Sequence, residues 1–326
     1  MATKSNVETD KTVLMGHSHV FLPISASLMA VIATLNALTL VTLATTPKLQ
    51  TIPNMYIASL AVADLFVAAT QAVLVAWQHP ISHRVFEDCR ALCLFLQCLC
   101  SAVEASSILS VLLITMDRYV YIEYPFFYAR VVTRTKVKVV IAVSWIICIL
   151  STLLCRVVIG IFVDRDFDGC DVYAMLYESS AMAFFNGIAF LVICITICVL
   201  YGVLLRTASR HARVIEGTFP IHIQTVSATS AATGRRTRKA ARIKARLSLK
   251  AVKRMAGVFF ILFSCWLPFF LVGLIGPKEV SVDVVHAFAL LGVSNSAANF
   301  TVYALADKDF RDAINKLLRP RLRDRQ

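Results

Sequence analysis

Charged residues are scarce in this chain of 326 residues, since Asp, Glu, Lys and Arg together make up only 16% of it. Soluble domains usually carry about 25% charged residues. Hydrophobic residues reach 58%, and the mean hydropathy is +0.72. An ordinary soluble protein is therefore excluded. The apolar residues gather in blocks of the length that crosses a bilayer, about 17–25 residues each.

Other features that the sequence lacks narrow the class further. The ten cysteines contain no pair of CxxC motifs with the spacing of a zinc site. Residues 1–20 are polar and lack the basic-then-apolar order of a cleaved signal peptide, so we expect the first membrane helix to target the chain. The net charge is +13, but the basic residues lie in short loops and not on one face of a folded domain. Nucleic acid is not an expected partner.

Seven hydrophobic segments are each long enough for a tilted membrane span. They are Val20–Thr45, Met55–Trp77, Ala91–Tyr121, Val137–Val163, Tyr177–Leu205, Val252–Ile275 and Val284–Leu305. The pattern predicts an all-α membrane protein, a bundle of seven transmembrane helices with a short amphipathic eighth helix at Asp307–Leu318. We divide the chain into an extracellular segment (1–19), the membrane domain (20–305, with a third inner loop at about 206–250) and a surface helix with a cytoplasmic tail (306–326).

The distribution of basic residues predicts the orientation of the bundle. With the N-terminus outside, 26 of the 33 Lys and Arg residues lie on the inner side and 7 on the outer side. This asymmetry follows the positive-inside rule. We therefore expect a multi-pass protein of the cell membrane with its N-terminus outside. The odd number of spans and the lack of an internal repeat disfavour a transporter built from inverted repeats.

Several ionisable residues lie within the predicted spans. Asp64 lies halfway along the second span, Glu104 in the middle of the third, and Asp117 with Arg118 at the end of the third. Such residues cost about 2.5–3.5 kcal/mol on insertion scales and are functional candidates by default. A lone Ser or Asn is more often a hydrogen-bonding contact between helices. A carboxylate, by contrast, needs a cation or a proton.

Short motifs in these spans occur in a fixed order. They are Asn36; Leu60-Ala-Val-Ala-Asp64; Asp117-Arg118-Tyr119 with Pro125; Trp145; Cys265-Trp266-Leu267-Pro268; Asn299-Phe-Thr-Val-Tyr303; and Phe310-Arg311. In this order and spacing, the chain from about Val20 to Leu318 resembles the rhodopsin-like family of G-protein-coupled receptors. The resemblance implies a receptor, not an enzyme, that is embedded in membrane lipids and activates heterotrimeric G proteins.

The resemblance also implies roles for individual residues. The family's sodium pocket, with the sodium ion as an allosteric modulator and no other cofactor, matches Asp64, Ser107, Asn295, Ser296 and Asn299, with Trp266 above them. Hard oxygen ligands around one carboxylate suit a small hard cation. For G-protein coupling and switching, the matching residues are Asp117, Arg118, Tyr119, Phe126, Tyr201 and Tyr303. Arg118 is expected to pair with Asp117 in the resting state, Tyr201 and Tyr303 to approach one another on activation, and Phe126 to insert into the G protein.

Family spacing pairs Cys93 with Cys170 in an outer disulfide, and Cys89 is the competing partner for Cys170. Among the departures from the family pattern, Leu35 replaces a Gly, and Ile193 and Phe300 replace the prolines of the fifth and seventh spans. Without these prolines the two helices lose a kink, which places the family's hinge mechanics in question.

The expected ligand site is built on one stripe of the third span. Amine receptors of the family carry an Asp where this chain has Cys100, and Glu104, one turn deeper, is a substitute counterion. The aromatic pair Phe269-Phe270 above Trp266 suits a cation through its ring faces. The expected ligand-contacting residues are Gln97, Cys100, Ser101, Glu104, Phe185, Trp266, Phe269 and Phe270. They predict a small cationic, amine-like ligand.

Alternatives stay open for both ligand and class. Glu104 is otherwise a protonated acid that is hydrogen-bonded within the bundle. The rest of the expected cavity is apolar and leaves room for a lipid, another hydrophobic ligand or a short peptide; it comprises Phe185, Ala189, Ala289 and Val293. A transporter or channel is a more remote alternative. Residues 302–326 contain no Ser or Thr, so for arrestin and receptor kinase we expect sites in the third inner loop, among them Thr225, Ser227, Thr229, Ser230 and Thr237.

Overall fold

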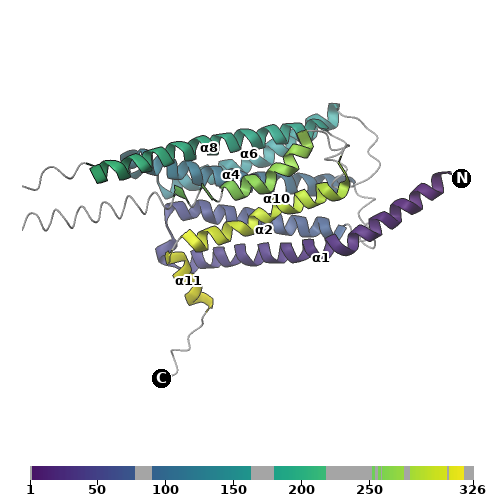
Figure 1. The fold of residues 1–326 in the computed structure, drawn as a ribbon, viewed down its shortest axis with the longest axis horizontal. Helices are drawn as coiled ribbons and strands as arrows, with labels where there is room; N and C mark the ends of the chain where they lie inside the picture. The colour runs from purple at the N-terminus through teal and green to yellow at the C-terminus, as the bar shows by residue number, and fades with distance from the viewer. Residues whose placement is uncertain are drawn as a thin grey trace, which may run out of the picture.

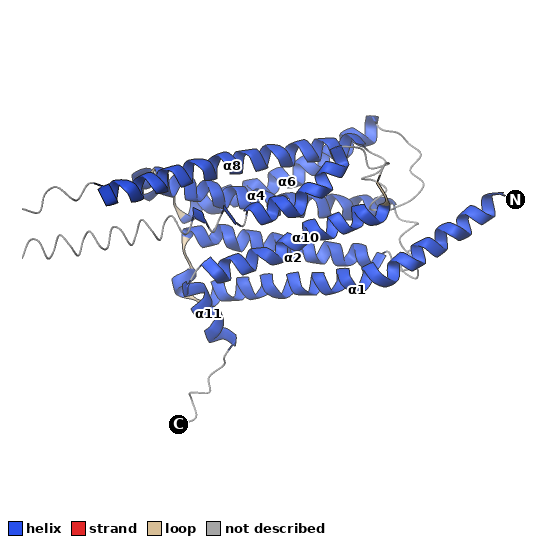
Figure 2. Ribbon diagram, in the orientation of Figure 1, coloured by secondary structure: helices blue, strands red, loops and turns tan. Residues whose placement is uncertain are grey.

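The computed structural model describes residues 2–77, 90–162, 180–217, 280–306 and 308–318, together with 252–274 except positions 254, 255 and 258. Regular structure in these residues is helical, and they contain no strand (Figure 2). The long helices lie side by side in one bundle, and a short helix leaves it at the end opposite to the N-terminus (Figure 1). The predicted all-α, seven-helix membrane fold is confirmed.

The elements follow the predicted segments in order. They are α1 (Ala2–Thr45), the 3-10 turn η1 (Pro47–Leu49), α2 (Ile52–Trp77), α4 (Arg90–Glu123), α5 (Pro125–Val131), α6 (Arg134–Phe162), α8 (Ser180–Gly217), α10 (Val282–Ala306) and α11 (Lys308–Leu318). The sixth span contains a further apolar helix, Phe259–Leu274. Among the described residues, five helices are individually long and apolar enough to cross a bilayer.

Helices are the expected form because a bilayer offers no water to the backbone, so each span must satisfy its own N–H and C=O groups. Hydroxyl side chains in these spans follow the same requirement. Thr39 and Thr42 of α1, and Ser106 and Ser110 of α4, donate to the carbonyl four residues earlier at 2.7–2.9 Å. Most polar side chains of this kind are therefore satisfied within their own helix.

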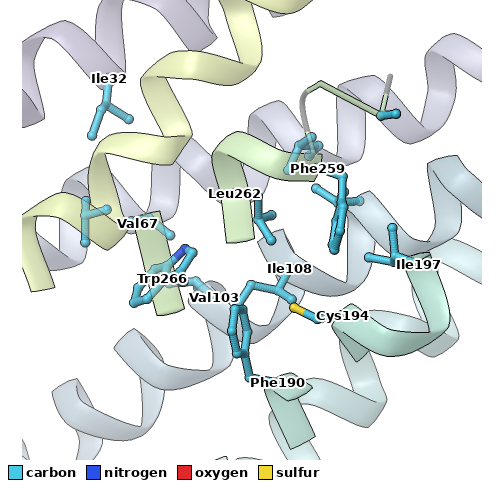
Figure 3. Packing of buried hydrophobic residues seen from close by; sticks show 14 of the residues in the cluster. Ile32, Val67, Val103, Ile108, Phe190, Cys194, Ile197, Phe259, Leu262 and Trp266 are labelled. Atoms are coloured by element: carbon cyan, nitrogen blue, oxygen red, sulfur yellow. The ribbon is translucent and has the colours of Figure 1, made fainter. Parts of the chain in front are cut away.

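The core of the bundle lies around α4, which packs against α2, α6 and α8. Side chains from six helices meet there, including Ile32, Val67, Ile108, Ile197 and Trp266 (Figure 3). At the inner end a second, smaller cluster joins Leu43 and Leu49 to Phe310 and Ile314 of α11. The cluster fixes α11 against α1, while Leu317 and Leu318 of the same helix remain exposed for contact with lipid.

Several boundaries differ from the sequence expectation. α1 begins at Ala2 and not near Val20, so its N-terminal part projects past the bundle (Figure 1). α8 continues to Gly217, twelve residues into the expected third inner loop. Hydrophobic runs mark the membrane-embedded part of a helix, and a helix can continue into water beyond them. α8 and α10 run unbroken through Ile193 and Phe300, as expected without the prolines.

Candidate functional site

Asp64 lies at the centre of a buried polar site between α2, α4 and α10. Its side chain is 0% exposed. Oδ1 accepts hydrogen bonds from the hydroxyls of Ser107 (2.7 Å) and Ser296 (2.8 Å), and Oδ2 accepts one from Nδ2 of Asn299 (2.9 Å). All three partners are uncharged, so the described residues supply no positive charge to this carboxylate.

The donor set of this site fits a small hard cation. Ser107 directs its hydroxyl to Asp64, whereas its neighbours Ser106 and Ser110 return theirs to the helix backbone. The side-chain carbonyl oxygens of Asn295 and Asn299 are buried and have no hydrogen-bond partner among the described residues. An unpartnered buried acceptor is costly. The Asn299 side chain contacts Asp64 through its Nδ2, so its oxygen lies beside the carboxylate and is a hard ligand that a cation would satisfy.

The α10 end of the site is anchored to α1. Nδ2 of Asn36 donates to the backbone carbonyls of Ile32 (3.0 Å) and Ser296 (3.1 Å). This bond holds the α10 turn that carries Ser296 against α1. Asn36 therefore acts through Ser296 and has no recorded contact with Asp64 itself.

Glu104 belongs to a second polar group, about one turn along α4 from Ser107. Oε1 of Glu104 accepts a hydrogen bond from Nε2 of Gln71 at 2.8 Å, and the Sγ of Cys100 lies 3.9 Å from the same oxygen. The Cys100 thiol also lies 3.6 Å from Oγ1 of Thr70. The partners of the Glu104 carboxylate are therefore uncharged, and the hydrogen bond from Gln71 directs it toward α2.

Three of the predicted aromatic residues, Trp266, Phe269 and Phe270, contact one another, and Phe190, which was not predicted, joins them. Trp266 contacts Phe269 and Phe270 at ring-centroid distances of 5.9 and 5.7 Å. Phe190 of α8 stacks on Phe270 at 4.3 Å. Ala189, which we expected to line the cavity, is exposed on α8 and does not face the interior of the bundle. α8 lacks the proline of the family and runs unbroken, and it is Phe190 that points inward.

The remaining expected ligand residues divide into two groups. Gln97 is buried and Ser101 half-buried on α4, on the stripe that also carries Cys100. The side chains of Phe185 and Cys93 lie outside the described residues, as do Cys170 and the candidate phosphorylation sites of the third inner loop. The disulfide and those sites stay predictions.

Gly292 allows α10 to approach the sixth span at Trp266. A Cβ atom at this position would lie 2.5 Å from Cε3 of Trp266 and 2.8 Å from two further ring atoms. We expect Gly292→Ala to destabilise the protein by about 1–3 kcal/mol, because a rigid indole must move in a packed core. The measurement is thermal unfolding of the purified protein.

The matched control for this variant is Gly202→Ala, since a Cβ at Gly202 meets nothing within 4 Å. Alanine is favoured over glycine inside a helix by roughly 0.5–1 kcal/mol, so the control should not lose stability. Equal melting temperatures for the two variants would show that the contact with Trp266 imposes no constraint.

The inner end of α4 carries the Asp117-Arg118-Tyr119 motif. Oδ1 of Asp117 accepts a hydrogen bond from the hydroxyl of Tyr128 in α5 at 2.9 Å. Burial, then this hydrogen bond and the negative charge of Asp117, raise the pKa of the Tyr128 phenol, so it stays a donor at neutral pH. Oδ2 of Asp117 and Nε of Arg118 are buried and have no hydrogen-bond partner among the described residues. The Asp117–Arg118 pair stays a prediction.

Two further predicted positions of the inner end, Phe126 and Tyr201, lie among the described residues. Phe126 of α5 is 91% exposed, so its ring projects from the molecule. The hydroxyl of Tyr201 is buried against α4, where Oγ1 of Thr115 lies 3.3 Å away. The side chain of Tyr303 lies outside the described residues, so its approach to Tyr201 stays a prediction.

Sequence reasoning missed Gln71, which donates a hydrogen bond to Glu104, and Tyr128, which donates one to Asp117. Gln71 lies seven residues after Asp64, on the same face of α2, and is a lone amide in an apolar segment. That placement was a usable signal. It also missed the bond from Nε1 of Trp145 to Oγ of Ser59 (3.1 Å), which ties α6 to α2.

Comparison with known proteins agrees with this arrangement. The chain is 28% identical to the human (Homo sapiens) alpha-1D adrenergic receptor, over 89% of this chain and 54% of the receptor. It is 26% identical to dopamine receptor 1 of Drosophila melanogaster (87% and 59%) and 26% identical to the adenosine receptor A2a of Equus caballus (86% and 67%). The chain thus spans about half the length of the adrenergic relatives that it matches.

A family model for seven-transmembrane receptors of the rhodopsin family matches residues 35–303, which include both polar sites, Trp266 and the motif at the inner end of α4. Proteins of this family are receptors and not enzymes, and they cross the membrane several times. The chain belongs to the rhodopsin family of seven-transmembrane receptors.

Proposed function

We propose that this receptor binds a small cationic amine in the outer half of its helix bundle and activates heterotrimeric G proteins at its inner end. The observation that carries the ligand class is Glu104, a carboxylate in mid-membrane with the neutral partners Gln71 and Cys100. A carboxylate in this setting gains most from a ligand that brings a positive charge. Relatives named as adrenergic and dopamine receptors support the same class.

The proposal that the inner end activates G proteins rests on the exposed Phe126 ring and on the Asp117-Arg118-Tyr119 motif. The Phe126 ring offers an apolar anchor that a partner protein can bury, and aromatic anchors dominate such interfaces. Asp117 and Arg118 lie eight and seven residues before the start of α5 at Pro125, and Asp117 accepts a hydrogen bond from Tyr128 of that helix. The excess of basic residues supports placing this end in the cytoplasm and the N-terminus outside the cell.

Two regulators complete the proposal. A sodium ion would be held by Asp64 with Ser107, Asn295, Ser296 and Asn299, and would supply the positive charge that the described residues do not. Arrestin and a receptor kinase would act through phosphorylation of the third inner loop, where Ser and Thr stand close to a strongly basic stretch.

The test is nucleotide exchange on purified G proteins in membranes that contain the full chain. We expect at least one small amine from a screen to activate exchange, and Arg118→Gln to abolish activation while amine binding persists. Membranes without the receptor are the control. Activation by neutral lipids or nucleosides with no response to any amine would overturn the ligand class. Ion flux in proteoliposomes without nucleotide exchange would favour a channel or transporter instead.

A further inference from the structure

The group around Glu104 forms a compact set of hydrogen-bonding side chains, which we call the α2–α4 polar cluster (Thr70, Gln71, Cys100 and Glu104). Gln71 Nε2 donates to Oε1 of Glu104 at 2.8 Å and lies 3.4 Å from the Cys100 sulfur. Thr70 directs its own hydroxyl hydrogen to the backbone of Phe66 and leaves its oxygen next to the Cys100 thiol. Gln71 and Cys100 thus contact the Glu104 carboxylate, and Thr70 contacts Cys100.

The α2–α4 polar cluster is separate from the Asp64 site. Gln71 lies seven residues beyond Asp64 on α2, a rise of about 10 Å along the helix. The recorded hydrogen bonds of Glu104 go to Gln71 and Cys100, whereas those of Asp64 go to Ser107 and α10. Each carboxylate therefore has its own set of hydrogen-bond partners.

The aromatic side of the bundle is already occupied by its own rings. Phe190 stacks on Phe270 at 4.3 Å and lies nearly parallel to Phe263 at 6.3 Å. Figure 3 shows Phe190 of α8 and Trp266 of the sixth span as members of the same buried cluster. One face of Phe270 is thus covered by Phe190. A cation beside Glu104 would therefore meet the Gln71 amide, the Cys100 thiol and the Thr70 hydroxyl.

We infer that Glu104 and Gln71 form a subsite selective for a primary ammonium group, on the α2 side of α4. A primary ammonium has three N–H donors, and the cluster offers matching acceptors: the Glu104 carboxylate, the Gln71 carbonyl once its amide turns, and the Thr70 hydroxyl oxygen. In the absence of ligand, the Gln71 amide donates to Glu104 in place of the ammonium. The exchange replaces a neutral donor with a charged one, which forms the stronger hydrogen bond.

A quaternary ammonium lacks N–H donors and is recognised by aromatic faces, which the α2–α4 polar cluster does not contain. The inference deepens the proposed function, on which it rests for the identity of Glu104 as counterion. It adds that Gln71 sets the preference among cations and that the head group lies toward α2.

Cys100 allows a test that does not require the natural ligand. Its thiol is not in a disulfide and lies beside the carboxylate. The probes are three methanethiosulfonates: aminoethyl (primary ammonium), trimethylammonioethyl (quaternary) and methyl (neutral). In each reaction the thiolate attacks the sulfenyl sulfur, an S–S bond forms and methanesulfinate leaves. Peptide mass spectrometry of the full chain in nanodiscs gives the rate at Cys100, divided by the rate of the same reagent with 2-mercaptoethanol.

We expect the normalised rate of the primary reagent to exceed those of the other two by about tenfold or more. Glu104→Gln should remove the preference for cations over the neutral reagent. Gln71→Leu should reduce the preference for primary over quaternary while the preference for cations persists. Glu123→Gln, an equivalent change at the inner end of α4, is the matched control and should alter neither ratio.

Equal normalised rates, or a faster quaternary reagent, would overturn the inference. So would a Cys100 that resists all three reagents while the exposed Cys198 reacts, because the subsite would then admit no cation of this size. Nucleotide exchange separates this result from the proposed function. If amines activate the receptor through Glu104 but the reagents label Cys100 at equal normalised rates, the proposed function holds and the subsite is wrong. If the primary reagent is faster but no amine activates the receptor, the subsite holds and the proposed function is wrong.

Discussion

Glu104→Gln is expected to raise the half-maximal concentration of an activating amine by about two to three orders of magnitude. Breaking one partner of a buried ion pair costs on the order of 3–5 kcal/mol, because the other charge is left desolvated and unpaired. The partners of Glu104 in this structure are the neutral Gln71 and Cys100, so no neighbouring described side chain replaces the lost charge. The measurement is a dose–response curve for the amine that activates the wild type.

The choice of Gln separates charge from packing. It keeps the length and hydrogen-bonding shape of Glu104, so surface expression should stay close to that of the wild type. Gln71→Leu in the same assay should cost less than Glu104→Gln, because it removes a neutral partner and leaves the charge. A shift below about threefold for Glu104→Gln would show that the carboxylate is a structural acid. A hydrophobic ligand would then be the better interpretation.

The membrane-spanning helices were predictable because their cause is local. A segment of sufficient apolar length must cross the bilayer as a helix, and spacing alone identified the surface helix that became α11. Helix ends were predicted less well. α1 and α8 both extend beyond their apolar runs, to Ala2 and Gly217, where hydrophobicity carries no information about helix continuation.

Three of the residues predicted for the Asp64 site, Ser107, Ser296 and Asn299, bond to Asp64, because the motif fixes which faces of α2, α4 and α10 meet. Ser107 and Ser106 differ by one position, and it is Ser107 that bonds Asp64. The contacts of Gln71 and Phe190 were not predictable in the same way. They depend on how far α2 and α8 are rotated and shifted against α4, and α8 runs unbroken through Ile193, which replaces a proline of the family pattern.

Asp64→Asn is expected to abolish the effect of sodium on agonist affinity. The site offers one carboxylate and several neutral oxygens, so the substitution removes its formal charge while retaining nearly the same shape. Neutral oxygens alone do not offset the cost of dehydrating a small cation in a buried site. The measurement is agonist competition binding in sodium chloride and in N-methylglucamine chloride at equal ionic strength, which keeps general screening constant.

A serine pair on α4 tests the geometry of the same site. The Ser107 hydroxyl bonds Asp64 at 2.7 Å, whereas the Ser110 hydroxyl bonds the backbone carbonyl of Ser106 at 2.7 Å. Ser107→Ala should therefore weaken the apparent affinity for sodium by about tenfold, in the range seen when a residue that supports a metal ligand is lost. Ser110→Ala removes an equivalent hydroxyl one turn away and should leave the sodium effect unchanged. If sodium still lowers agonist affinity in Asp64→Asn, or if the two serine variants behave alike, the cation binds elsewhere. The unpartnered oxygens of Asn295 and Asn299 would then need another explanation, such as a bound water.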